Sequence, residues 1–146
     1  MATHTRESIP TGIPGLDDVL CGGLPANRLY LLQGDPGVGK TTAALQFLRE
    51  GIRRGETSLY VSLSETRDEL EGVMHSHGWD TEPLHLYQLN VGAPHVDMQA
   101  EENTVFVPAE VEFGERMDAL LAEIDRVKPQ RLVIDAAITA RISFES

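Results

Sequence analysis

The chain has 146 residues, enough for one domain, and its 12 lysines and arginines against 23 aspartates and glutamates give a formal net charge of −11. This acidity disfavours broad attraction to DNA or to an anionic membrane surface. The chain has a single cysteine, no run near the roughly 20 apolar residues of a membrane span, and no apolar signal-peptide core. We therefore expect a cytoplasmic protein without an internal disulfide.

The first predicted elements lead towards a glycine-rich loop. Residues 1–10 are polar and predict a flexible arm, with the domain proper over 11–146. Leu16, Val19 and Leu20 are spaced for one face of a short helix, which the glycines after it would close. The apolar run at 28–33 has the length of a strand. A short helix and a strand are thus expected before the loop.

The loop itself carries a recognisable pattern. Its residues, Gly34-Asp35-Pro36-Gly37-Val38-Gly39-Lys40-Thr41, fit G-x-x-x-x-G-K-[ST], the phosphate-binding P-loop, and Thr42 follows. The expected strand precedes it, and apolar residues at helical spacing follow it up to Gly55. Strand, glycine loop and helix is the context that the motif needs, so we predict that all nine residues from 34 to 42 bind a nucleotide.

The residue types of the loop suit this chemistry. Glycines at 34, 37 and 39 let backbone N–H groups approach phosphate oxygens without obstruction by side chains. The helix that begins near Lys40 directs its free N–H groups and about half a positive charge towards the anion. Lys40 can then reach the β- and γ-phosphates, and the Thr41 hydroxyl can ligate Mg²⁺. A glycine-rich turn with an incidental lysine is the alternative.

The rest of the chain alternates strands with helices. Strands are predicted at 57–64, 84–89 and 131–135, the last as a buried strand, and helices at 66–78 and 113–127. Thr66 and Glu69 form a capping box at the start of the first of these helices. Residues 90–108 have no clear period and are expected to form a long surface loop. The alternation predicts an α/β fold whose mostly parallel sheet is flanked by helices.

Asp135 ends the last predicted strand. A carboxylate at the C-terminal tip of an apolar strand matches the Walker B position, which holds the Mg²⁺ shell. The alternative is an ordinary polar residue in a turn at a strand end. Downstream of a P-loop we interpret Asp135 as a metal ligand beside Thr41.

Together these blocks resemble the KaiC-like branch of the RecA-superfamily P-loop ATPases. The matching residues lie at 11–25, 34–42, 60–65, 77–79, 108–114 and 132–135, in the order in which the family has them. The resemblance implies a RecA-like fold that uses ATP and Mg²⁺, and a homo-oligomer, typically a hexameric ring with ATP between subunits. Some members phosphorylate themselves, and relatives act on DNA.

The sequence departs from this family in two places. Members often carry paired glutamates after the second strand, one of which activates the attacking water, whereas this chain has Ser64 and Glu65. Glu65 could still orient water, and the alternative is a solvated residue ahead of the Thr66-capped helix. The family also continues well past the Walker B strand, with the next strand inserted beside it. The last residue here, Ser146, lies eleven residues after Asp135, so we expect an N-terminal fragment of the domain, incomplete at its C-terminus.

The leading hypothesis is an ATP-binding ATPase module of KaiC type that acts as a nucleotide-driven switch or ring motor, with a signalling or clock-like output and a protein signalling partner. In it Lys40 holds phosphate, Thr41 and Asp135 hold Mg²⁺, and Glu65 holds the water. One alternative is a DNA recombination or repair ATPase, which the net charge disfavours. The others are a serine/threonine autokinase and an inactive truncated fragment.

Overall fold

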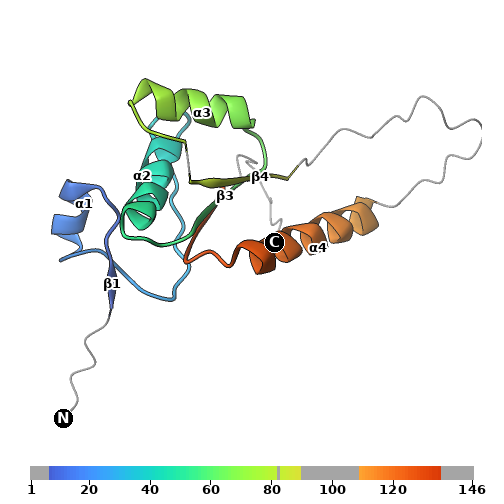
Figure 1. The fold of residues 1–146 in the computed structure, drawn as a ribbon, viewed down its shortest axis with the longest axis horizontal. Helices are drawn as coiled ribbons and strands as arrows, with labels where there is room; N and C mark the ends of the chain where they lie inside the picture. Colours follow the sequence, from blue (N-terminus) through green and yellow to red (C-terminus); the bar gives the residue numbers. More distant parts are fainter. Residues whose placement is uncertain (1–6, 82, 90–108, 136–146) are drawn as a thin grey trace, which may run out of the picture.

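The computed structural model describes residues 7–81, 83–89 and 109–135, which form helices packed around a small parallel sheet (Figure 1). In chain order the elements are β1 (Ser8–Ile9), α1 (Pro14–Val19), β2 (Leu24–Pro25), α2 (Lys40–Arg53), β3 (Ser58–Ser62), α3 (Arg67–Ser76), β4 (His85–Gln88), α4 (Ala109–Val127) and β5 (Arg131–Asp135). The loop predicted at 90–108 lies outside the described residues. No helix among those described combines the length and apolarity that a membrane span requires.

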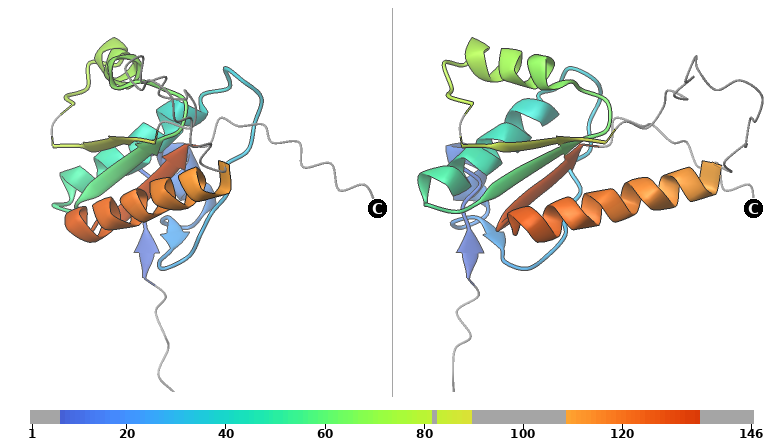
Figure 2. Two further views of the ribbon diagram at one scale, coloured as in Figure 1. Left: turned by 90° about the vertical axis from the view of Figure 1, so that its right-hand side faces the viewer. Right: turned by 45° about the vertical axis from the view of Figure 1, so that its right-hand side comes forward.

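β3 is the central strand of the sheet, whose order is β4-β3-β5 with all pairs parallel. Leu59 of β3 pairs with His85 of β4 on one side and with Leu132 of β5 on the other. Helices α2 and α3 lie on one face of this sheet and α4 lies on the other (Figure 2). The α/β architecture with helices flanking a parallel sheet is therefore confirmed.

All five residues of β3 are buried, because helices cover it on both faces. Alternate side chains of the strand enter two different apolar clusters. The cluster under α2 and α3 consists of Leu45, Leu48, Tyr60, Leu70, Met74 and Leu84, and the cluster under α4 consists of Leu59, Val61, Leu89 and Leu120. Each fully buried side chain of this size contributes about 1.5–3 kcal/mol. The two clusters therefore hold the helices to the sheet.

The predicted helix signals at residues 66–78 are present. The Thr66 side chain accepts a hydrogen bond from the backbone N–H of Glu69, and the Glu69 carboxylate accepts one from the backbone N–H of Thr66 at 2.7 Å. Gly78 follows the end of the helix with a left-handed φ of 69°, which glycine adopts without strain. The capping box is thus confirmed, and α3 begins directly after its N-cap residue, Thr66.

The strand predicted at 28–33 is not formed. These residues have no strand assignment, and the side chains of Leu29 and Leu31 are 99% and 88% exposed. A strand needs a hydrogen-bonded neighbour, and in the part of the chain that is described the sheet consists of β3, β4 and β5 alone. Apolar composition alone therefore cannot hold this segment in the sheet.

β5 is also less buried than predicted. Arg131 is buried, but Leu132 and Ile134 on the α4 side of the strand are 37% and 51% exposed. α4 covers only part of that face, since its N-terminal half extends beyond the sheet (Figure 2). Phe113, in that N-terminal half, is exposed, and Leu121 is exposed although its neighbour Leu120 is buried. The prediction of a buried strand at 131–135 was therefore wrong.

The N-terminal segment is ordered further than its composition suggests. Ser8–Ile9, predicted as part of a flexible arm over 1–10, forms β1 and pairs antiparallel with β2. Next to it, the Asp17 carboxylate accepts hydrogen bonds from the backbone N–H and hydroxyl of Thr11, at 2.8 and 2.7 Å. These bonds keep the pKa of Asp17 below its ordinary value, against the effect of burial. The segment is thereby fastened to α1.

Arg131 connects this segment to the sheet and is 2% exposed. Its guanidinium donates to the carbonyl oxygens of Pro10 and Phe47 at 2.7 and 2.8 Å, and to Glu56 Oε2 at 2.9 Å. It also lies over the Phe47 ring, 4.7 Å from the centroid. Nη2 is buried without a hydrogen-bond partner among the described residues. One cation thus joins the N-terminal segment, α2 and β5.

Replacing Arg131 with Leu should therefore lower the free energy of unfolding by about 3 kcal/mol, since it leaves two carbonyls and Glu56 without their donor. Urea titration followed by circular dichroism measures this loss. Arg126→Leu, which removes a solvent-exposed pair with Glu123, should cost much less, because water and salt screen that pair. Equal losses in the two variants would show that the buried network does not stabilise the fold.

Glu50 forms a second charged cluster at the C-terminal end of α2. Its carboxylate accepts hydrogen bonds from Arg53 and Arg54, at 2.6 and 2.8 Å. The hydrogen bond from Arg53 is the main reason that the pKa of Glu50 falls to about 2. Both arginines are well exposed, so solvent and salt screen much of the attraction.

Because this pKa is depressed on folding, the contribution of Glu50 is fully present above the ordinary value of 4.5 and is lost as the pH falls towards about 2. Glu50→Gln should lower stability by about 0.5–1 kcal/mol at neutral pH, and the gap between variant and parent should close over that acid range. Thermal melts from pH 6 to pH 2 test this. A gap that stays constant with pH, or one insensitive to 1 M salt, would contradict the assignment.

Candidate functional site

The glycine loop leads directly into α2, which begins at Lys40. Gly37 and Gly39 have left-handed φ values of 83° and 100°, so a side chain at either position would strain the backbone. Gly39 is the N-cap residue, and no described side chain caps the helix. The first turn of α2 therefore presents its N–H groups to the space in front of the loop.

The close approach of Gly34 to Val38 within the loop requires a glycine at position 34. A Cβ placed there would lie 2.8 Å from Val38 Cγ2, closer than side-chain contacts allow. The backbone N–H of Val38 points back towards the carbonyl oxygen of Asp35, at 3.4 Å, which closes the turn that contains Pro36. The loop is thus folded tightly over the helix start rather than extended.

Lys40 reaches back across this loop. Its ammonium group donates hydrogen bonds to the carbonyl oxygens of Gly34 and Asp35, at 2.7 and 2.8 Å. Both acceptors are neutral, so the positive charge of the lysine remains uncompensated at the loop. A phosphate oxygen offers a stronger, charge-assisted partner at the same place.

Thr41 links the loop to the end of β3. Its hydroxyl donates to Glu65 Oε1 over a long 3.4 Å contact. The backbone of Glu65 is held in turn by Ser62, whose Oγ accepts from the Glu65 N–H at 2.9 Å and donates to its carbonyl oxygen at 2.7 Å. Gln88 also donates to that carbonyl, at 3.3 Å. The position of Glu65 is therefore determined by the tips of β3 and β4.

Asp135, the last residue of β5, also lies near Glu65, because it is opposite Ser62 in the parallel ladder. The hydroxyl of Tyr60 donates to Asp135 Oδ2 at 2.6 Å and lies 3.4 Å from Glu65 Oε2. The structure thus brings Thr41, Glu65 and Asp135 into one cluster, and Thr41 and Asp135 are connected through Glu65 and Tyr60. Thr42 follows in the first helical turn, and its side chain forms no hydrogen bond with the cluster in the described part of the chain.

The two carboxylates affect each other electrostatically. Burial raises the pKa of Glu65, and the negative charge of Asp135 raises it further, while the hydrogen bond from Thr41 acts in the opposite direction. Burial, followed by the hydrogen bond to Asp135, raises the pKa of the Tyr60 hydroxyl. Two carboxylates held close together are less stable as anions, so the cluster favours a cation.

The residues present fit Mg²⁺ bound together with a nucleotide triphosphate. The loop offers backbone donors, an uncompensated ammonium and glycines that leave room for phosphate, and the cluster offers hydroxyl and carboxylate oxygens, the donors that Mg²⁺ prefers. The described residues contain no group of three metal-ligating His, Cys, Asp or Glu side chains. Mg²⁺ in such sites takes only one or two protein ligands, and phosphates and water supply the rest.

Two residues of this cluster were missed by the sequence analysis. Tyr60 and Ser62 were treated only as members of the strand predicted at 57–64 and of the block at 60–65 that matches the family. The alternation of side chains along a strand could have indicated their role, because Tyr60 and Ser62 share one face of β3 and Ser62 stands at its C-terminal end. In parallel sheets ligands bind at that end.

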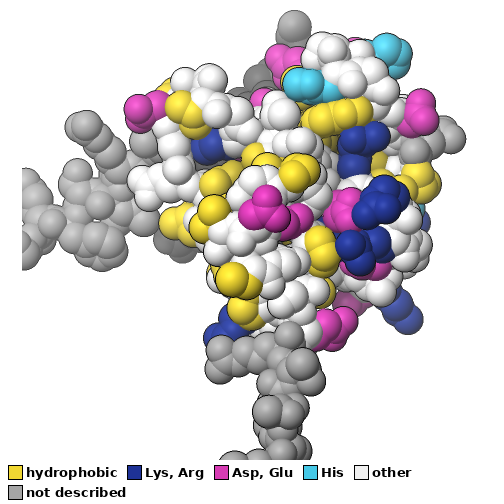
Figure 3. Space-filling model, turned by 90° about the vertical axis from the view of Figure 1, so that its left-hand side faces the viewer, with side chains coloured by type: hydrophobic (Ala, Val, Ile, Leu, Met, Phe, Trp, Pro, Cys, Tyr) yellow, Lys and Arg dark blue, Asp and Glu magenta, His cyan; other side chains and the backbone are white. Residues whose placement is uncertain are grey.

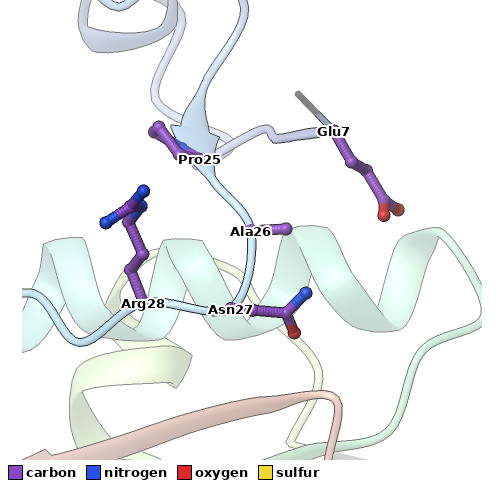
Figure 4. A pocket seen from close by; sticks show the side chains of 5 residues that line it. All are labelled: Glu7, Pro25, Ala26, Asn27 and Arg28. Atoms are coloured by element: carbon purple, nitrogen blue, oxygen red, sulfur yellow. The ribbon is translucent and has the colours of Figure 1, made fainter. Parts of the chain in front are cut away.

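Other surfaces of the described residues offer weaker candidates for a binding site. A cavity of about 160 Å³ lies beside β2 and is lined by Glu7, Pro25, Ala26, Asn27 and Arg28, whose side chains do not converge on one point (Figure 4). It contains no residue of the glycine loop. On the face that carries α1, acidic and basic side chains are interspersed with apolar ones (Figure 3). Among the described residues of that face, acidic side chains lie between the basic ones, so they form no continuous basic surface for nucleic acid.

Comparison with known proteins agrees with this geometry. The family described as the KaiC ATPase matches residues 9–144. A UPF0273 protein of Pyrococcus horikoshii is 31% identical over 92% of this chain and 56% of its own length, and the circadian clock protein KaiC3 of Synechocystis is 34% identical over 92% of this chain and 26% of its own. The crystal structure of a KaiC-like protein from Pyrococcus horikoshii superimposes with a TM-score of 0.67 at 29% identity, over 88% of this chain and 53% of that one.

The chain thus spans about half the length of the UPF0273 relatives and of the solved structure that it matches. Within that span the agreement extends from β1 through the glycine loop and past Asp135. The family match covers far more than the loop, and the solved structure shares the fold of this chain. On this evidence the chain belongs to the KaiC family of ATPases, within the RecA superfamily.

Proposed function

We propose that this chain binds ATP with Mg²⁺ and serves as the nucleotide-binding part of a nucleotide-driven switch or ring motor. The observation that supports this most directly is the convergence of three elements. The start of α2, the end of β3 and the end of β5 meet in the cluster of Thr41, Glu65, Tyr60 and Asp135. Family membership makes ATP the expected nucleotide.

In this proposal each site residue has a distinct task. The backbone N–H groups of the glycine loop, from Gly34 to Thr42, bind the phosphates, and Lys40 exchanges its two carbonyl partners for phosphate oxygens. Thr41 and Asp135 provide the protein ligands of Mg²⁺, which when bound neutralises charge on the phosphates. Glu65 orients the attacking water, a task to which its raised pKa and its position beside Thr41 are suited.

The assembly in which this happens is also a proposal. The described part of β5 pairs only with β3, and residues 28–33 lie exposed without a ladder partner. Both features are consistent with a further strand that lies between β5 and residues 28–33 and comes from outside the described residues. They are also consistent with a homo-oligomeric ring in which the site is completed between subunits. The cytoplasmic location and a protein signalling partner belong to the same proposal.

Mg-ATP should therefore stabilise the chain by about 2.7 kcal/mol at a ligand concentration one hundred times its Kd. Lys40→Ala should remove most of this gain, because the loop then lacks its cation, whereas Arg28→Ala, which removes an exposed cation upstream of the loop, should keep it. Thermal melts with and without Mg-ATP make the comparison. A gain that survives in the Lys40 variant would overturn the assignment of the phosphate site.

We further expect this 146-residue chain by itself to hydrolyse ATP very slowly. A cation from a neighbouring subunit contributes roughly 10³–10⁵ in rate at sites of this kind. In the described part of this chain, the cation that is hydrogen-bonded to the loop is its own Lys40. Steady-state phosphate release by the monomer is the measurement. Turnover by the monomer at about 1 s⁻¹ or more, as in competent ATPases, would contradict the proposal that the site is completed between subunits.

A further inference from the structure

Tyr60 combines a fully buried ring with a hydroxyl that ends among charged groups. It lies in the middle of β3, its side chain is 0% exposed, and the ring packs in the apolar cluster under α2 and α3. Its ladder partners are Leu86 of β4 and Val133 of β5. Packing therefore leaves the ring little freedom, so the place where the hydroxyl emerges is determined by the core.

The hydroxyl emerges beside both carboxylates. Asp135 lies two residues beyond the direct partner of Tyr60 in the ladder, a diagonal that a phenol side chain is long enough to span. The hydroxyl has one proton, and the distances of 2.6 Å to Asp135 Oδ2 and 3.4 Å to Glu65 Oε2 show that Asp135 receives it. The bond to Asp135 is short and charge-assisted.

Packing alone does not account for this hydroxyl. A phenylalanine ring would fill the same space in the core, and a buried hydroxyl costs free energy unless it is hydrogen-bonded. Without the hydroxyl, the Asp135 carboxylate would lose its donor in the described part of the chain and would face Glu65 directly. Two neighbouring negative charges repel each other, and the side chains of Asp135 and Glu65 could then turn away from Thr41.

We propose that Tyr60 is a positioning residue, which holds Asp135 and Glu65 in the one arrangement that faces Thr41 and thereby sets the affinity of the site for Mg²⁺. This inference rests on the proposed function, because it concerns the same nucleotide site. The contacts of the Tyr60 hydroxyl in the described part of the chain are with the two carboxylates. Tyr60 acts through Asp135, and so it contributes to binding with metal but not to binding of the phosphates by the glycine loop.

The test is the affinity of the full chain for ATP, measured by isothermal titration in Mg²⁺ and again in EDTA. Tyr60→Phe should leave the affinity in EDTA within about twofold of the parent and lower the affinity in Mg²⁺ about tenfold, the size expected for a lost charge-assisted hydrogen bond. Tyr87→Phe on the neighbouring strand β4 is the matched control, since Tyr87 packs in the other cluster, under α4. It should change neither affinity.

The outcomes separate this inference from the function on which it rests. If Tyr60→Phe loses no affinity in Mg²⁺, or loses it equally in Mg²⁺ and EDTA, Tyr60 only packs and the inference is wrong. If the parent binds ATP under neither condition, the proposed function itself fails. Asp135→Asn should show the same loss in Mg²⁺, and combining it with Tyr60→Phe should add little, because the two side chains act as one unit.

A second measurement covers the case in which Tyr60→Phe does not fold. The chain has three tyrosines, so a Tyr30→Phe/Tyr87→Phe variant retains Tyr60 alone. Its ultraviolet difference spectrum should change when ATP and Mg²⁺ are added together and not when ATP is added in EDTA. The reason is that Mg²⁺ binds Asp135, the hydrogen-bond partner of the Tyr60 hydroxyl, whereas ATP alone does not. An unchanged spectrum with Mg-ATP would overturn the inference.

Discussion

The arrangement of the whole molecule depends on one constraint, the burial of β3 between two strands and two layers of helix. Every other described strand of the sheet has a neighbour on one side only, whereas β3 is paired on both sides and all of its residues are buried. The same strand carries the tyrosine that reaches Asp135 and the serine that holds Glu65. Stability and site geometry thus come from the same five residues, and a change that shifts β3 must disturb both.

The periphery is held by polar contacts rather than by apolar area. Arg131 binds backbone carbonyls from two distant segments, and Asp17 binds the backbone of Thr11, so the N-terminal segment is fastened through hydrogen bonds to buried or half-buried groups. In contrast, the apolar side chains of residues 29–32 and of the outer part of β5 stay exposed. Exposed apolar side chains and an open strand edge are each typical of regions that another segment or molecule covers.

Local signals in the sequence were sufficient for much of the site. The glycine loop, its lysine and the helix after it form a contiguous stretch, so their geometry follows from glycine conformations and from the free N–H groups of a helix start. The capping box at Thr66 and Glu69 is equally local. Asp135 could be anticipated because parallel strands end at one edge of a sheet, and that is where the structure places it, opposite Ser62.

What the sequence determined by itself was therefore the fold class, the glycine loop and the carboxylates at strand ends, because each depends on a short range of residues or on simple periodicity. Only the tertiary structure decided that residues 28–33 stay outside the sheet, that Arg131 is buried, and that Tyr60 joins Glu65 to Asp135. These outcomes depend on which segments become neighbours. A strand pattern in the sequence does not show whether a partner strand is present. A tyrosine in a core pattern does not show which groups its hydroxyl contacts.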